Sequence, residues 1–308
     1  MTDADLYQRG ARTLLGSWEE YARGATGAAV RRFPGGAAAV FPGEPERAVY
    51  NNALLEGDLG AAERADALEA MEAAYAAAGV TRFAAWVHER DQAMRGDLER
   101  RGYTLDESTR AMGMALHDLR LPRPRIELAQ PDWSEYLRIL GVPPDFLSGA
   151  DPAAYHVLIA RLDGENVAAA MAFDLAGDCG IYALGTLEHA RRRGLGTALT
   201  TLHLHDALAR GCQTASLQST PMAERIYAAV GFRDLGRILE YGRRGHGPGD
   251  EPAVTSSVGL HAQPGLGPAV SPGGGRRGRC SGARCRGSGW PWPGPGASRP
   301  APPAAWPG

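Results

Sequence analysis

A loop with three arginines and two glycines joins a predicted strand to a predicted amphipathic helix, and this unit constrains the fold more than any other part of the chain. The strand is predicted over residues 181–187, and the loop spans residues 191–197. Leucine and alanine then recur at helical spacing. The first amides of a helix have no internal partner and lie at the positive end of its dipole, so they bind phosphate oxygens well. The unit therefore predicts a site for a diphosphate.

Two common phosphate motifs are excluded. The chain has no lysine and no Gly-x-x-x-x-Gly-Lys-Ser/Thr sequence. A dinucleotide-binding fingerprint needs three glycines and an acidic residue after the next strand, whereas the strand predicted over residues 214–218 ends without one. An ordinary exposed basic turn is the alternative interpretation of the loop taken alone.

A second motif lies downstream, where Ala223, Tyr227, Gly231 and Phe232 form the pattern Ala-x-x-x-Tyr-x-x-x-Gly-Phe. Together with the arginine–glycine loop, in this order and at this separation, the chain resembles the GNAT superfamily of N-acetyltransferases. The resemblance covers about residues 150–242. It implies an α/β (α+β) fold, with a mixed, mostly antiparallel twisted sheet flanked by helices, and acetyl-CoA as cosubstrate.

The resemblance also implies roles for individual residues. Main-chain amides of the loop would hold the diphosphate, the preceding strand would bind the pantetheine arm and polarise the thioester carbonyl, and Tyr227 would protonate the departing thiolate. Thr220 replaces the family's frequent asparagine, and its hydroxyl would cap the next helix or touch the pantetheine. The predicted cofactor-binding residues are Leu184, Gly185, Thr186, Arg191, Arg192, Arg193, Gly194, Leu195, Gly196, Thr197 and Thr220.

The sequence departs from the family where a glutamate base is often found, because Gly180 stands there. Asp178 and Tyr182 are weak candidates for ordering a water that accepts the amine proton. Alternatively, no base is needed if the amine arrives neutral.

Bulk properties are typical of a globular enzyme of two domains, since the chain has 308 residues and a formal charge of −2. Four cysteines form no disulfide framework, and two of them lack the neighbours of a zinc site. The chain has no apolar run long enough to cross a membrane and begins with an acidic segment, so we expect a cytoplasmic protein without a membrane partner.

One plan occurs twice along the chain. Residues 61–78 and 194–210 are predicted helices, and each is followed by a strand, a second helix, a glycine–aromatic pair and an extended segment. We predict tandem GNAT-like domains at 1–120 and 125–242, with a single enlarged domain as the alternative. From residue 243 onward the chain is rich in glycine, proline and arginine, and a disordered tail is expected over 243–308. A solvated tail without a role is favoured over an electrostatic tether to RNA.

The first copy lacks the residues that bind the cofactor. Its loop reads Glu-Gly-Asp-Leu-Gly over residues 56–60, where two carboxylates would repel a diphosphate. Leu98 takes the place of Tyr227. We therefore expect this copy to be a scaffold and part of the acceptor pocket. Trp86, His88 and Glu89 of this copy are interpreted as packing residues, and lining that pocket is the alternative.

Two functions from different classes remain. The first is acetyl transfer to a small-molecule or peptide amine, by a monomer or homodimer that binds no specific nucleic acid. The second is a catalytically silent sensor that binds acyl-CoA through the same loop. No metal site is expected, because His203 and His205 lie two residues apart on a helix and face different ways.

Overall fold

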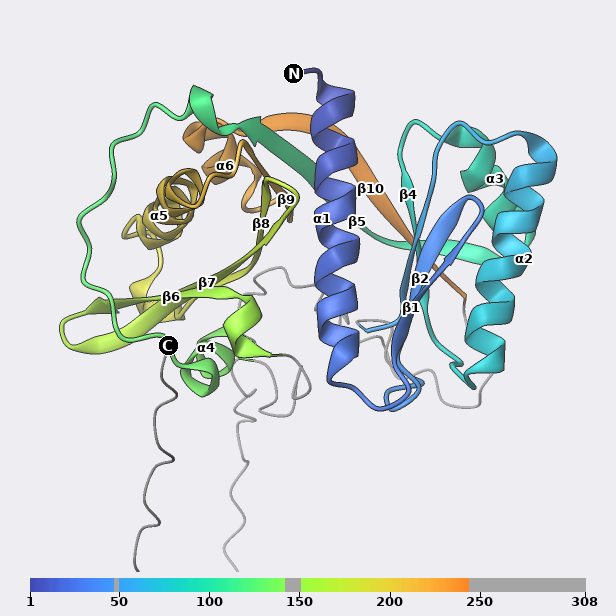
Figure 1. The fold of residues 1–308 in the computed structure, drawn as a ribbon, viewed down its shortest axis with the longest axis horizontal. Helices are drawn as coiled ribbons and strands as arrows, with labels where there is room; N and C mark the ends of the chain where they lie inside the picture. The colour runs from blue at the N-terminus through green and yellow to red at the C-terminus, as the bar shows by residue number, and fades with distance from the viewer. Residues whose placement is uncertain (47–49, 142–150, 244–308) are drawn as a thin grey trace, which may run out of the picture. The chain divides into compact units, whose positions relative to one another are not determined.

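The computed structural model describes residues 1–46, 50–141 and 151–243, which form one ten-stranded sheet with helices on both faces (Figure 1). The α-helices are α1 (Asp3–Arg23), α2 (Ala61–Ala77), α3 (Gln92–Arg100), α4 (Trp133–Leu140), α5 (Leu195–Ala209) and α6 (Glu224–Val230). The strands are β1 (Ala29–Phe33), β2 (Gly36–Val40), β3 (Asn52–Leu55), β4 (Ala84–His88), β5 (Tyr103–Ala115), β6 (His156–Leu162), β7 (Glu165–Leu175), β8 (Asp178–Thr186), β9 (Thr214–Ser219) and β10 (Arg233–Arg243).

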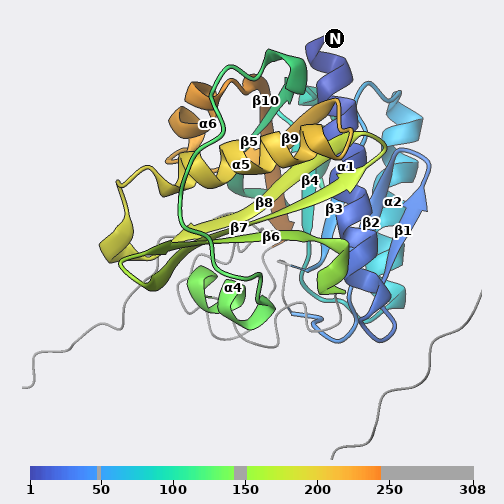
Figure 2. The ribbon, with the colours of Figure 1, turned by 60° about the vertical axis from the view of Figure 1, so that its left-hand side comes forward.

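The two faces of the sheet carry different helices. Helices α1 and α4 pack on one face, called the α1 face below, where Trp18, Tyr21 and Tyr136 belong to the buried core. Helices α2 and α3 cover the opposite face of β2–β5, and α5 and α6 cover that face of β7–β9. Figure 2 shows α5 and α4 on opposite sides of strands β6–β8. The mixed α/β fold predicted from the sequence is confirmed.

The two halves of the chain exchange their last strands. The strand order is β1-β2-β3-β4-β10-β5-β9-β8-β7-β6, so β10 from the second half lies between β4 and β5 of the first. Strand β5 in turn pairs with β9 of the second half, from Arg110 opposite Ser219 to Ala115 opposite Thr214. The sequence predicts a separate sheet for each copy, whereas the exchange joins them into one. The boundaries 1–120 and 125–242 stay a prediction.

Helix α1 is the main element that the motifs do not predict. It begins with a capping box, in which the Asp5 amide donates to Thr2 Oγ1 (3.1 Å) and the Thr2 amide donates to Asp5 Oδ2 (2.9 Å). Along its length it packs on β5, β8 and β9 near the middle of the sheet. Helix α1 therefore covers one face of these three strands.

No helix among the described residues is long and apolar enough to cross a membrane. Two expectations fall outside the described residues. One is the tail from residue 244 onward, and the other is most of the loop of residues 140–151 that we expect to shape the acceptor site.

Candidate functional site

Strands β8 and β9 run parallel but remain paired only at their beginnings. The pairs are Asp178 with Thr214, Cys179 with Ala215, and Gly180 with Ser216, and no pair follows in the described ladder although both strands continue. The Asp178 carboxylate, 2% exposed, accepts hydrogen bonds from Thr214 Oγ1 (2.6 Å) and Ser216 Oγ (2.7 Å). These bonds hold the strands together at the closed end. Beyond it β8 and β9 are no longer paired, and the gap between the two strands is called the slot below.

Strand β8 carries a bulge beside this slot. Its partner β7 pairs Met171 with Tyr182 but Ala169 with Gly185, so β8 has one extra residue in this interval. Ala183 has a positive φ of 42°, and its carbonyl accepts a hydrogen bond from the Tyr136 hydroxyl (3.4 Å). A bulge leaves main-chain groups unpaired and re-aims them. The family resemblance implies that this strand polarises the thioester carbonyl, and the bulge lies beside Leu184 and Gly185.

The arginine–glycine loop forms a turn that exposes successive amides. Arg192 and Gly194 both have positive φ, 62° and 77°, and helix α5 begins directly afterwards. Among the described residues, none accepts a hydrogen bond from the main-chain amides of residues 192–197. Consecutive free amides in such a turn, at the positive end of a 15-residue helix, favour an anion.

The three arginines of the loop lie differently. Arg191 folds back, and its Nε donates to the Thr186 carbonyl at the end of β8 (3.1 Å). Arg193 Nη1 lies 3.9 Å from Asp163 Oδ2 in a pair that is largely exposed. Arg192 is exposed. Arg191 therefore fixes the loop against the strand, while Arg192 and Arg193 supply positive charge in water, where each contributes little alone.

The corresponding helix terminus in the first half is closed. The Gly60 amide, just before α2, donates to Glu63 Oε2 (2.7 Å), so the helix caps itself with a carboxylate. Glu56 and Asp58 add negative charge nearby. The Gly60 amide is therefore unavailable to an anion, and the carboxylates of Glu56 and Asp58 would repel one.

Tyr227 lies on α6 with its ring in the core between α6 and the sheet. It is 8% exposed and meets Phe232 edge-on, with ring centroids 6.0 Å apart. Burial raises the pKa of Tyr227 to about 12, so its hydroxyl keeps its proton at neutral pH. Thr220 does not cap this helix as predicted. The N-cap is Ala223, without a side-chain bond, and Thr220 contributes its carbonyl to the Ala223 amide (3.0 Å).

Neither residue considered as a base, Asp178 or Tyr182, is suited to accept the amine proton. A Cβ at Gly180 would collide with the Tyr182 hydroxyl, so the Tyr182 ring covers the place of the family's glutamate. Burial raises the pKa of Tyr182 well above its usual value, so the hydroxyl stays protonated and forms no phenolate that could take a proton. Both carboxylate oxygens of Asp178 accept hydrogen bonds from hydroxyls. His203 is buried, and burial lowers its pKa to about 4. No cluster of metal ligands occurs in the part of the chain that is described.

A family model described as Acetyltransferase (GNAT) family matches residues 115–232. Residues 115–232 therefore belong to the GNAT acetyltransferase superfamily. No curated protein sequence matches the chain.

Solved structures with the GNAT fold match most of the chain. A GCN5-related N-acetyltransferase from Kribbella flavida has a TM-score of 0.60 and 20% identity, over 77% of this chain and 96% of its own. One from Sphaerobacter thermophilus has a TM-score of 0.51 and 18% identity, over 80% and 95%. A tandem GNAT protein from the clavulanic acid biosynthesis pathway has a TM-score of 0.50 and 14% identity, over 78% and 97%. These likenesses concern the fold, and they support its tandem organisation.

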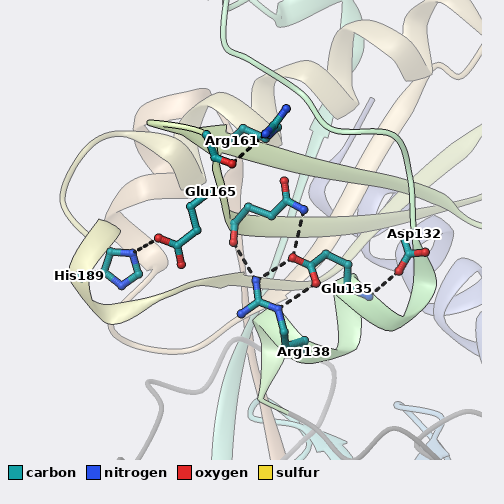
Figure 3. Close-up of polar contacts among 8 residues, drawn as sticks. Asp132, Glu135, Arg138, Arg161, Glu165 and His189 are labelled. Carbon is teal, nitrogen blue, oxygen red and sulfur yellow. Dashed lines mark hydrogen bonds and ion pairs between the residues drawn. The ribbon is translucent and has the colours of Figure 1, made fainter.

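A polar network holds α4 against β7 (Figure 3). Glu135 pairs with Arg138 through two hydrogen bonds of 2.9 and 2.7 Å, and Arg138 also donates to the Asn166 carbonyl on β7 (3.0 Å). The guanidinium lowers the pKa of Glu135 to about 2, so the pair stays charged. Helix α4 is thereby fixed so that its last residue, Leu140, lies over Gly185 of β8. None of the sequence motifs predicted this network.

A small pocket lies between α1 and the middle of the sheet. Strands of both halves line it, including Ala111 of β5, Ser216 and Gln218 of β9, and Ile238 of β10. Ser216 is also the last paired residue at the closed end of the slot. The pocket therefore adjoins the slot on the α1 face.

Proposed function

We propose that this protein is an acetyl-CoA-dependent N-acetyltransferase that moves an acetyl group to a primary amine. The observation that carries the proposal is the opening of β8 and β9 beyond Gly180, next to a helix terminus whose amides have no acceptor among the described residues. A slot between parallel strands accepts an extended arm, and the helix terminus accepts a diphosphate. Both features fit acetyl-CoA.

In this proposal each part of the slot has one task. The amides of residues 192–197 hold the diphosphate, Arg192 and Arg193 attract it, and main-chain groups of Leu184, Gly185 and Thr186 bind the pantetheine arm. The bulge on β8 directs an amide at the thioester oxygen, where it stabilises the charge that develops during attack. When bound, acetyl-CoA supplies an activated acetyl group. Transfer forms the bond from nitrogen to the acetyl carbon, breaks the bond to sulfur, and leaves a thiolate and an amine proton to be placed.

Tyr227 donates the proton to the thiolate. Its pKa, raised to about 12 by burial, keeps the hydroxyl protonated at neutral pH, so its proton is available to the sulfur as the bond to carbon breaks. Its burial on the α6 side of the sheet excludes water from the exchange. The amine proton has no dedicated acceptor in this proposal, since Asp178 holds the strands together and Gly180 has no side chain. The amine therefore attacks in its neutral form, the proton that its nitrogen loses passes to solvent, and solvent returns a proton to Tyr227.

The lack of a base at Gly180 and Asp178 also supports a second candidate, a protein that binds acyl-CoA and transfers nothing. Release of free thiol from acetyl-CoA, measured against a panel of primary amines, separates the two. We expect amine-dependent thiol release together with calorimetric binding of acetyl-CoA. Binding without release on any amine would support the sensor, and absence of binding would refute both.

A further inference from the structure

Two arginines lie directly opposite each other on the exchanged strands, Arg110 on β5 and Arg237 on β10. Like charges placed in this way repel each other, so both side chains need carboxylate partners. Glu224 supplies one for each. Its Oε2 lies 3.1 Å from Arg110 Nε, and its Oε1 accepts a hydrogen bond from Arg237 Nη2 (3.2 Å). Arg110 also pairs with Asp234. These four residues are called the Glu224 cluster below.

The Glu224 cluster lies on the face of the sheet opposite α1. Ala111 lines the pocket under α1, and neighbouring residues of a strand point to opposite faces, so Arg110 points to the other face. Met112 of the same strand belongs to the core that also contains Tyr227. The side chains of Arg110 and Glu224 are only 19% and 23% exposed, so solvent screens their attraction less than it screens a surface pair.

Glu224 is the first residue of α6, the helix that carries Tyr227. This helix has seven residues, and its N-cap, Ala223, makes no side-chain bond. A helix this short is marginal by itself, so its position depends on contacts with the rest of the protein. The buried side chains of Tyr227 and Val230 provide apolar contacts. The two ion pairs of Glu224 therefore add fixed points at the beginning of the helix.

These fixed points lie one turn away from Tyr227. Residues three positions apart are neighbours on the surface of a helix, about 4.5 Å apart along its axis. Because Glu224 is held by two strands, α6 is restrained both in rotation and in translation along the sheet. The Tyr227 hydroxyl stands at the far end of its ring and moves with any such displacement. A misplacement of about 1 Å in a reacting group can lower a rate about a hundredfold.

The first half of the chain supplies part of this support. Arg110 belongs to β5, and Glu89 directly follows β4. Glu89 Oε1 accepts a hydrogen bond from the Arg237 amide (2.9 Å), at the point where the register of β10 shifts between Asp234 and Arg237. The first half therefore contacts Glu224 through Arg110 and also holds the irregular segment that carries Arg237.

We infer that Arg110 is a positioning residue for Tyr227, through which the first half of the chain holds α6 in the place where the tyrosine hydroxyl meets the departing thiolate. This inference rests on the proposed acetyl transfer and on the acid role of Tyr227. It adds that a residue of the half without a diphosphate loop determines turnover. Arg110 acts only through Glu224 and α6.

The test is a double-mutant cycle on the full chain, measured as thiol release from acetyl-CoA with the primary amine of the panel that wild type acetylates fastest. We expect Arg110→Ala and Glu224→Ala each to lower kcat about tenfold or more, with acetyl-CoA affinity in calorimetry changed less than twofold. In the Tyr227→Phe background each should lower kcat less than twofold, because the group that they position is gone.

Arg64→Ala is the matched control. Arg64 of α2 pairs with Asp97 of α3 at 2.5 Å, and its side chain is 15% exposed, close to the value for Arg110. This pair joins the two helices over the first-half core, which does not include Tyr227. We expect kcat of Arg64→Ala within twofold of wild type. A fall in kcat equal to that of Arg110→Ala would show that the loss of any buried ion pair has this effect, and it would overturn the inference.

Two other outcomes would also overturn the inference while leaving acetyl transfer standing. In one, kcat is unchanged in both Arg110→Ala and Glu224→Ala, and two variants are used so that a folding defect in one does not decide the result. In the other, the tenfold loss persists in the Tyr227→Phe background, or Tyr227→Phe itself has no effect. Absence of thiol release by wild type with every amine of the panel would refute acetyl transfer and the inference together.

Discussion

Two glycines flank helix α5, and replacing each by alanine separates ligand binding from stability. Gly194 precedes the helix with φ 77°, and Gly211 follows it with φ 91°. An added Cβ would meet no atom within 4 Å at either position. Alanine in this left-handed region costs about 1–2 kcal/mol, partly offset by about 0.4–1 kcal/mol from a less flexible unfolded chain. We expect each substitution to lower the free energy of unfolding by about 1 kcal/mol.

Only Gly194 lies among the amides proposed to hold the diphosphate. A methyl group there narrows the approach to the main chain and turns neighbouring amides away. A hydrogen bond to a charged group contributes about 1.5–3 kcal/mol. Loss of about 2 kcal/mol weakens binding roughly thirtyfold. Gly194→Ala should therefore bind acetyl-CoA about thirtyfold more weakly than Gly211→Ala.

Calorimetry serves both measurements, with unfolding scans for stability and titration for acetyl-CoA. A 1 kcal/mol loss corresponds to a fall in Tm of about 3 °C for a folded region of this size. The reasoning is refuted if the two variants have the same affinity for acetyl-CoA. It is refuted equally if Gly194→Ala binds as wild type does while both variants show the expected loss of Tm.

Three further predictions concern buried polar side chains. Tyr227→Phe should lower turnover about a hundredfold or more and leave acetyl-CoA affinity unchanged, and an unchanged turnover number in steady-state assays removes its acid role. Asp178→Ala leaves the buried Thr214 and Ser216 hydroxyls without their acceptor, so it should lower the free energy of unfolding by about 2–4 kcal/mol in denaturant unfolding. The control Asp66→Ala, at an exposed position, should lower it by about 0.5 kcal/mol or less. Glu240 has a pKa of about 8, raised by burial and by Glu107 and Asp106, so the stability it contributes is present below about pH 4 and is lost as the pH rises through 8. Glu240→Gln should flatten that part of the stability profile between pH 5 and 9, and an unchanged slope contradicts the assignment.

Local patterns predicted individual elements well. The helix predicted over residues 61–78 is α2, Ala61–Ala77, and the strand predicted over 181–187 is β8, Asp178–Thr186. Periodicity and glycine positions are properties of a few neighbouring residues, so a sequence reveals them directly. The strand exchange was not predicted, because β10 could pair within its own half by the same alternation of side chains. The sequence of a strand does not by itself show which strands lie next to it in the sheet.

The candidate site also has parts that the sequence could predict and parts that it could not. The helix terminus at residues 192–197 and Tyr227 follow from motifs that are continuous in sequence. The roles of Asp178 and Tyr182 depend on where their side chains end, and that depends on Thr214, Ser216 and the missing Cβ of Gly180. Glu107 and Glu240 are 133 positions apart in the chain and become neighbours only through the exchanged strands. The sequence around a carboxylate in an alternating strand does not show that a second carboxylate lies opposite it.

The strand exchange explains why a first half without cofactor-binding residues is retained. Both neighbours of β10, namely β4 and β5, come from the first half, and β9 has β5 as its second neighbour. A chain consisting of the second half alone would expose the edges of β9 and β10, together with Leu235 and Ile238 from the core. The first half also supplies α1, Leu54 of β3 and Ala111 of β5, which line the pocket beside Ser216. The first half is therefore indispensable for the sheet, even though its own helix terminus at Gly60 is closed by Glu63.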